Sequence, residues 1–159
     1  GRNVLADGLW KASELNPSYI IDLATLTGSV VVALGHEATG LFSNNQSLSQ
    51  RIQAVGDHVD EISWPLPLLP AFEKQMTSSK IADVRNQGKG RWGGASQAAG
   101  FLKQFVQERE TQEGKSQIPW AHLDIAGTAG IWGGETNVLV SHGATGIQVR
   151  ALHRLITQE

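Results

Sequence analysis

His122 and Asp124 alternate within a short β-prone run, and both carry side chains of the kind that bind metal ions. Alternate residues of a strand face the same side of a sheet, so these two side chains would lie close together. The pair also fits a hydrogen-bonded strand histidine followed by a carboxylate at the strand end, which is the interpretation we favour. Metal binding by this pair is the alternative. The other histidines are scattered without ligand spacing, so they add no further ligand to it.

A glycine-rich stretch at residues 88–94 could cradle a phosphate with its backbone amides. A P-loop, however, has Ser or Thr after its Gly-Lys pair, whereas Lys89 is followed by Gly90. We therefore interpret these glycines as allowing a tight bend in front of a helix, with phosphate binding as the alternative. The turn from Gly28 to Gly35 lacks the Gly-x-Gly-x-x-Gly pattern of dinucleotide sites.

Composition excludes several other chemistries. The chain has no cysteine and no Gly-x-Ser-x-Gly motif, which leaves nucleophilic catalysis unsupported and excludes disulfides and cysteine-based metal sites.

Trp92 and Trp132 fall in glycine-rich loops, where an indole ring could stack on a ligand. The formal net charge of −2 argues against a nucleic-acid partner. No apolar run approaches the roughly 20 residues that cross a membrane.

The scaffold for these residues is predicted from segments of helical periodicity that alternate with short β-rich runs, a pattern typical of an α/β fold. Helices are predicted at residues 2–15, 47–59, 72–76 and 95–106 and after Gly146. Strands are predicted at residues 19–23, 39–43, 61–64, 80–85 and 120–125. The apolar run at residues 29–34 is too short for its periodicity to decide between helix and strand.

Three local features refine this scheme. Ser47 and Gln50 fit a capping box for the helix that begins there. Residues 108–117 are charged and lack apolar periodicity, which predicts a solvent-exposed loop or a frayed helix end. The turn at residues 24–28 follows a predicted strand, and α/β proteins bind ligands at the carboxyl ends of strands. We therefore expect a ligand site at this turn.

Four segments, in order along the chain, resemble one known family, and the second of them has two parts. Residues 22–28 read Asp-Leu-Ala-Thr-Leu-Thr-Gly, and residues 120–127 read Trp-Ala-His-Leu-Asp-Ile-Ala-Gly. Between them, Ala-Asp-Val at residues 82–84 precedes Gly-Gly-Ala-Ser-Gln-Ala-Ala-Gly-Phe-Leu at residues 93–102, and Gly-Ala-Thr-Gly-Ile-Gln-Val-Arg follows at residues 143–150. Their order and spacing are similar to those of the leucyl (cytosol) aminopeptidase family, the two-metal peptidases of the M17 class. The resemblance covers essentially the whole chain.

The resemblance implies a three-layer α/β sandwich, with a mixed, mostly parallel sheet and helices on both faces. Gly1 and Arg2 match the end of the family signature Asn-Thr-Asp-Ala-Glu-Gly-Arg. We therefore expect residues 1–159 to be a truncated, C-terminal portion of the catalytic domain, without the N-terminal domain. The two divalent metal ions of the family, Zn²⁺ or Mn²⁺, would have their ligands upstream of Gly1, so no metal ligand is expected in this chain.

The resemblance also implies a catalytic role for Arg2, which matches the signature arginine. In the family this residue holds a bicarbonate-like anion that assists proton transfer from the attacking water. The physical chemistry agrees, because an arginine in the first turn of a helix adds a two-pronged cation to the positive end of the helix dipole.

Five further positions match the family's substrate site. Thr25, Leu26 and Gly28 match positions whose backbone groups hold the peptide, and Ala126 and Ala129 match the wall of the pocket for the first side chain. The small side chain of Ala129, where some relatives are bulkier, leaves the size preference open.

The implied activity is metal-dependent release of N-terminal amino acids, of the leucine type, from peptides with a free N-terminus. The family also implies a cytoplasmic homo-hexamer with no membrane or nucleic-acid partner, and we expect this piece alone to be inactive. The alternative is a non-catalytic structural or DNA-binding module derived from the same family, which the near-neutral charge disfavours.

Overall fold

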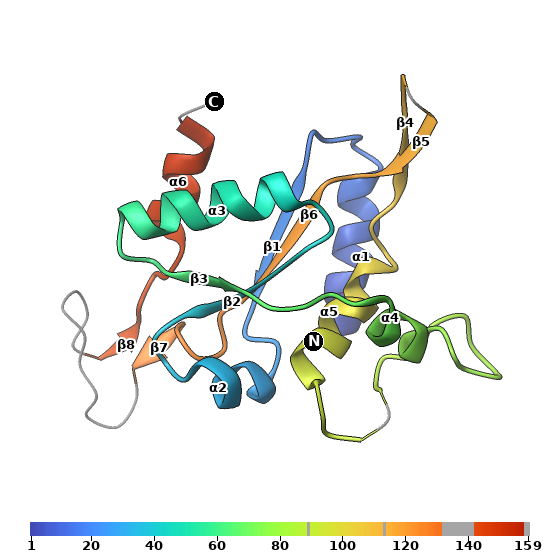
Figure 1. Ribbon diagram of the computed structural model, residues 1–159, viewed down its shortest axis with the longest axis horizontal. Coiled ribbons are helices and arrows are strands. Elements are labelled where there is room, and N and C mark those ends of the chain that lie inside the picture. Colours follow the sequence, from blue (N-terminus) through green and yellow to red (C-terminus); the bar gives the residue numbers. More distant parts are fainter. Residues whose placement is uncertain (89, 113, 132–141, 158–159) are drawn as a thin grey trace.

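A four-stranded sheet lies at the centre of the computed structural model, which describes residues 1–88, 90–112, 114–131 and 142–157 (Figure 1). The strand order is β1-β6-β2-β3. The strands are β1 (Ile20–Ala24), β6 (Trp120–Asp124), β2 (Thr39–Ser43) and β3 (Ser63–Pro65). The β1–β6 and β2–β3 pairs are parallel, and β2 runs antiparallel to β6. The predicted α/β class, with a mixed and mostly parallel sheet, is confirmed.

Helices cover both faces of this sheet, as a three-layer sandwich requires (Figure 1). One face packs against α1 (Arg2–Ser13), α2 (Gly28–Leu34), α4 (Pro70–Met76) and α5 (Gly94–Lys103). The other packs against α3 (Gln46–His58) and α6 (Val149–Thr157). Two small antiparallel sheets of two strands each complete the described elements: β4 (Glu108–Thr111) with β5 (Gly114–Gln117), and β7 (Gly130–Ile131) with β8 (Gly143–Ala144).

The core divides at β6, all of whose residues are buried. Trp120 packs into a cluster with Phe42 and Leu102 on the α5 face. Leu123 packs with Ile52 on the α3 face. Since alternate side chains of a strand enter opposite layers, β6 contributes to both cores at once.

The structure decides the run at residues 29–34, which belongs to α2. Thr27 caps this helix, because its Oγ1 accepts a hydrogen bond of 3.1 Å from the backbone N–H of Val30. The predicted strands at residues 19–23, 39–43 and 120–125 and the helix at residues 2–15 are confirmed to within two residues at each end. This cap favours a helix in a run that is too short for its periodicity to decide.

The strand predicted at residues 80–85 is wrong, since this segment forms bends and turns. Ser79 Oγ accepts hydrogen bonds from the N–H groups of Ile81 (3.3 Å) and Ala82 (3.2 Å), so a local turn takes the backbone groups that a strand would pair. Ile81 is 97% exposed, and burial therefore gives this β-branched residue no reason to join the sheet.

Two other local expectations are also corrected. In the segment predicted as a loop or a frayed helix end, Glu108–Thr111 and Gly114–Gln117 pair as the antiparallel strands of the β4–β5 hairpin. The hairpin's side chains are largely exposed, so no apolar alternation marks it in the sequence. The capping box expected at Ser47 and Gln50 is not used, because α3 begins earlier. Its cap is Asn45, whose side chain accepts from the N–H of Leu48 at 2.9 Å.

Among the helices that the described residues form, none has both the length and the hydropathy for a bilayer crossing.

Leu123→Ala should lower the free energy of unfolding by about 2–5 kcal/mol, because it opens a cavity beside the central strand. Leu123 is fully buried, whereas the matched control, Ile81→Ala, alters an exposed side chain and should change stability by no more than about 0.5 kcal/mol. Urea unfolding followed by circular dichroism measures both values. Equal losses for the two variants would contradict the assignment of Leu123 to the core.

Candidate functional site

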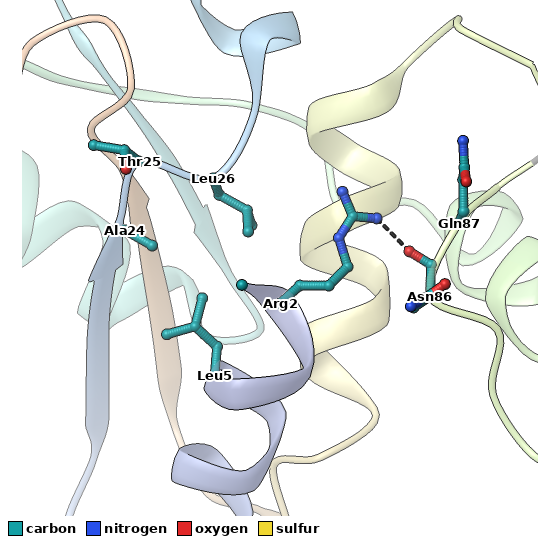
Figure 2. A pocket seen from close by; sticks show the side chains of 8 residues that line it. Arg2, Leu5, Ala24, Thr25, Leu26, Asn86 and Gln87 are labelled. Atoms are coloured by element: carbon teal, nitrogen blue, oxygen red, sulfur yellow. Dashed lines mark hydrogen bonds between the residues drawn. The ribbon is translucent and has the colours of Figure 1, made fainter.

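A cavity of about 620 Å³ opens where β1 ends and α1 begins (Figure 2). Its lining comprises Gly1, Arg2, Leu5, Ala24, Thr25, Leu26, Asn86 and Gln87. In Figure 2, Ala24 and Leu26 reach toward the cavity from one side, and Arg2 rises from the first turn of α1 on the other. The cavity therefore lies at the carboxyl end of a parallel strand, where the sequence led us to expect a ligand site.

Arg2 places a fixed positive charge in this cavity. Its Nη1 donates a hydrogen bond to the backbone carbonyl of Asn86, a residue 84 positions away in the sequence. Partial burial lowers the pKa of the Arg2 guanidinium from its ordinary value. An arginine nevertheless remains charged at neutral pH, so the cavity keeps a cation that suits an anionic ligand.

The turn that lines the other side of the cavity is held by Asp124, at the end of β6. The Asp124 Oδ1 atom accepts hydrogen bonds from the N–H groups of Leu26 (3.0 Å) and Thr27 (3.4 Å). The Asp124 Oδ2 atom accepts from Thr27 Oγ1 at 2.7 Å. Because Asp124 is only 1% exposed, water does not compete for these bonds.

The loop after β6 is attached to the same carboxylate. The N–H of Ala126 donates to Asp124 Oδ1 at 3.2 Å. Further along, the N–H of Ala129 donates to the carbonyl of Ile125 at 2.9 Å, which closes a tight turn. The ring of His36 contacts the carbonyl oxygen of Gly127 through Nδ1 at 2.6 Å, so the turn after α2 also supports this loop.

The structure brings together some of the residues expected to bind substrate. Arg2, Thr25 and Leu26 line one cavity. Gly28 lines a second cavity, of about 800 Å³, between the beginnings of α2 and α5. Ala126 is joined to the 25–28 turn through Asp124, but neither Ala126 nor Ala129 lines the cavity that contains Arg2.

Sequence reasoning missed Asn86 and Gln87, which line the Arg2 cavity. They follow the segment that was wrongly predicted as a strand, and no motif marks them. It also missed that Asp124 anchors the turn. The available signal was that Asp124, at the end of one predicted strand, could accept hydrogen bonds from backbone amides of the turn at the end of another. The sequence pattern instead paired Asp124 with His122.

His122 and Asp124 do not act as a pair. The His122 Nδ1 atom lies 2.6 Å from Asp22 Oδ1, and Trp120 Nε1 donates to Asp22 Oδ2 at 2.7 Å. Asp124 instead bonds to the 25–28 turn. The two side chains therefore have separate partners, as the favoured hydrogen-bonded interpretation predicts.

The residues that the structure describes do not fit a divalent metal ion. Among them, no three His, Cys, Asp or Glu side chains gather closely enough to hold one. The lining of the Arg2 cavity carries a guanidinium and no carboxylate. Since Zn²⁺ and Mn²⁺ take anionic or imidazole ligands, the described lining offers none of the usual side chains.

The structure describes the two glycine-rich loops only in part. Lys89 and Trp132 lie outside the described residues, so the phosphate and stacking alternatives remain predictions there. Trp92 is 74% exposed, and the guanidinium of Arg91 lies 4.2 Å from the centre of its ring. This cation–π contact already covers one face of the indole.

A helix-covered mixed sheet with a charged cavity at a strand end defines an α/β domain of the kind that binds small ligands. The chain belongs to the cytosol aminopeptidase family: the family model for the catalytic domain matches residues 1–153. The family expected from the four sequence motifs is thus confirmed.

Relatives agree with this assignment. A probable cytosol aminopeptidase of Afipia carboxidovorans is 48% identical over 99% of this chain, and one of Methylorubrum populi is 47% identical over 99%. A third, from Syntrophotalea carbinolica, is 44% identical over the full chain. The chain spans 29% of the length of each of these relatives.

Thr27→Val should lower the free energy of unfolding by about 1–3 kcal/mol, because it removes the α2 cap and one donor to the buried Asp124 carboxylate. Thr27→Ser keeps the hydroxyl and is the matched control, with an expected loss below about 1 kcal/mol. Denaturant unfolding of the two variants measures both free energies of unfolding. Equal stability of the valine and serine variants would show that the hydroxyl does not anchor the turn.

Proposed function

We propose that this chain is part of a metal-dependent aminopeptidase that releases N-terminal amino acids, of the leucine type, from peptides with a free N-terminus. One observation carries the proposal: Arg2, Thr25 and Leu26 surround a single cavity. All three lie within the range matched by the catalytic domain of the cytosol aminopeptidase family. They come from the beginning of α1 and the end of β1, so the fold and not sequence proximity brings them together.

In this proposal Arg2 binds a bicarbonate-like anion. The hydrogen bond to the carbonyl of Asn86 fixes one nitrogen of the guanidinium, and the remaining N–H groups are donors of the type that bind a planar anion in a two-pronged manner. An anion held there is a proton acceptor, and it would take a proton from the attacking water during hydrolysis. Arg2 therefore orients the base without itself exchanging a proton.

The substrate would lie against the 25–28 turn and the loop after β6. Backbone groups of Thr25, Leu26 and Gly28 would hold the peptide and its amino group. Ala126 and Ala129 would form the wall against the first side chain, where a small residue leaves space for an apolar group such as leucine. The shared attachment of the turn and of Ala126 to Asp124 supports this arrangement, since it fixes the position of one wall relative to the other.

The family implies two divalent metal ions, Zn²⁺ or Mn²⁺, which polarise the scissile carbonyl and activate water when bound. The described residues supply no ligand set for them, so we propose that their ligands belong to the remainder of the catalytic domain, upstream of Gly1. Residues 1–159 would then be the C-terminal portion of that domain. By the same family membership, we propose that the whole protein is a cytoplasmic homo-hexamer.

Arg2→Ala should lower kcat for leucine p-nitroanilide by about 10²-fold in the full-length protein, because the proton acceptor loses its binding site. Arg2→Lys keeps the charge but not the two-pronged geometry, and it should fall between alanine and wild type. Steady-state kinetics give kcat, and atomic absorption gives the metal content, which should not change. An unchanged kcat, or a loss that only follows metal loss, would remove the proposed role of Arg2.

Residues 1–159 alone should release no leucine from leucine p-nitroanilide when Mn²⁺ or Zn²⁺ is added, because the residues that the structure describes supply no metal-ligand set. The full-length protein, assayed under the same conditions, is the positive control. Release of p-nitroaniline, followed by absorbance, measures both. Clear turnover by residues 1–159 would refute the proposal that the metal ligands lie elsewhere.

A further inference from the structure

Asp124 joins two segments that are far apart in the sequence. Its carboxylate accepts four hydrogen bonds, three from Leu26 and Thr27 and one from Ala126. Both oxygens are used, and the side chain is almost completely buried. A buried carboxylate with this many donors is a strong local constraint, because charge-assisted hydrogen bonds are about twice as strong as neutral ones.

These bonds determine the orientation of two peptide planes in the 25–28 turn. The N–H and C=O groups of a trans peptide point in opposite directions. Since the N–H of Leu26 points at Asp124, the carbonyl oxygen of Thr25 faces away from it. In the same way, the weaker bond from the N–H of Thr27 turns the carbonyl oxygen of Leu26 away.

Both carbonyl oxygens are left without partners in the described part of the chain, where no hydrogen bond ends on either. Thr25 and Leu26 also line the Arg2 cavity. Two oriented acceptors beside a cavity suit a ligand with N–H donors, such as the ammonium group and the first amide of a peptide.

A second carboxylate, which is partly buried, shows what a purely structural role looks like. Asp22 lies on β1, and its side chain is 12% exposed. It bonds to Trp120 and His122, which are side chains of the neighbouring strand, and it does not line the Arg2 cavity. Asp22 therefore stabilises the sheet without orienting the turn.

We infer that Asp124 is a positioning residue for substrate. By holding the N–H groups of Leu26 and Thr27, it presents the carbonyl oxygens of Thr25 and Leu26 to the amino end of the peptide. This inference deepens the proposed aminopeptidase function and rests on it. Asp124 itself touches neither substrate nor metal, and it acts through the backbone of the turn.

The test compares Asp124→Asn with Asp22→Asn in the metal-loaded, full-length protein. The asparagine at position 124 keeps the shape of the side chain, but it loses the charge and one acceptor oxygen. We expect kcat/KM for leucine p-nitroanilide to fall at least about tenfold more in Asp124→Asn than in Asp22→Asn. The larger part of this loss should appear in KM, because the two carbonyls contact the substrate before and during reaction.

Thermal unfolding and metal content of both variants are measured alongside the kinetics. If Asp124→Asn does not fold, Thr27→Val carries the same test, because it removes one donor to Asp124 and leaves the carboxylate intact. Its KM should rise, and Thr27→Ser should restore it.

The outcomes separate the two claims. The positioning role would be overturned if Asp124→Asn and Asp22→Asn lose kcat/KM to the same extent and this loss only parallels their loss of melting temperature. A wild-type KM in a folded Asp124→Asn or Thr27→Val variant would also overturn it. Absence of leucine release by the wild-type, metal-loaded protein would instead overturn the proposed function.

Discussion

β6 is the strand on which the rest of the structure depends. It pairs with β1 on one edge and with β2 on the other, so both rows of its backbone hydrogen-bonding groups are used. Its side chains enter both helical layers, and all of them are buried. A strand constrained in this way has one possible register, since a shift by a single residue would exchange the two faces. The end of β6, where Asp124 lies, is therefore a fixed point for the loops around it.

Carboxylates connect different segments at three places around this sheet; Asp124 and Glu61 are buried, and Asp22 is partly buried. Asp22 joins β1 to β6, and Asp124 joins the 25–28 turn to the loop after β6. Glu61, which is 3% exposed, accepts hydrogen bonds from Arg150 Nε at 3.1 Å and from the N–H of Ala151 at 2.9 Å. That last contact places a negative charge at the first turn of α6, where the helix dipole stabilises it. Buried charges are costly unless they are paired or hydrogen-bonded, so each of these contacts favours one arrangement of its segments.

The sequence predicted the parts of this fold in which burial imposes a period. The strands at residues 39–43 and 120–125 and the apolar face of the helix with Ile52 were predicted because their side chains fill the core. Prediction from the sequence failed where polar contacts or exposed side chains, and not burial, determine the local structure. The β4–β5 hairpin is too exposed to show apolar alternation, and Ser79 turns the chain at residues 80–85. For the site, motifs identified the 25–28 turn and Arg2, but Asn86 and the role of Asp124 follow only from contacts across about 84 to 98 residues of sequence.

The positive charge of Arg2 determines which groups are needed around it if a cation is to bind nearby. A guanidinium repels a cation in the same partly buried space, and the repulsion is stronger there than in water. The described lining includes no carboxylate to offset it. Cations could bind nearby only if anionic groups from elsewhere lie between them and Arg2. An anion bound to Arg2 would serve the same purpose, because it neutralises the guanidinium on the side that faces the reacting groups. If the proposed function holds, the arginine, its anion and the ligands of the metal ions would form one electrostatic unit, to which the described residues contribute the arginine.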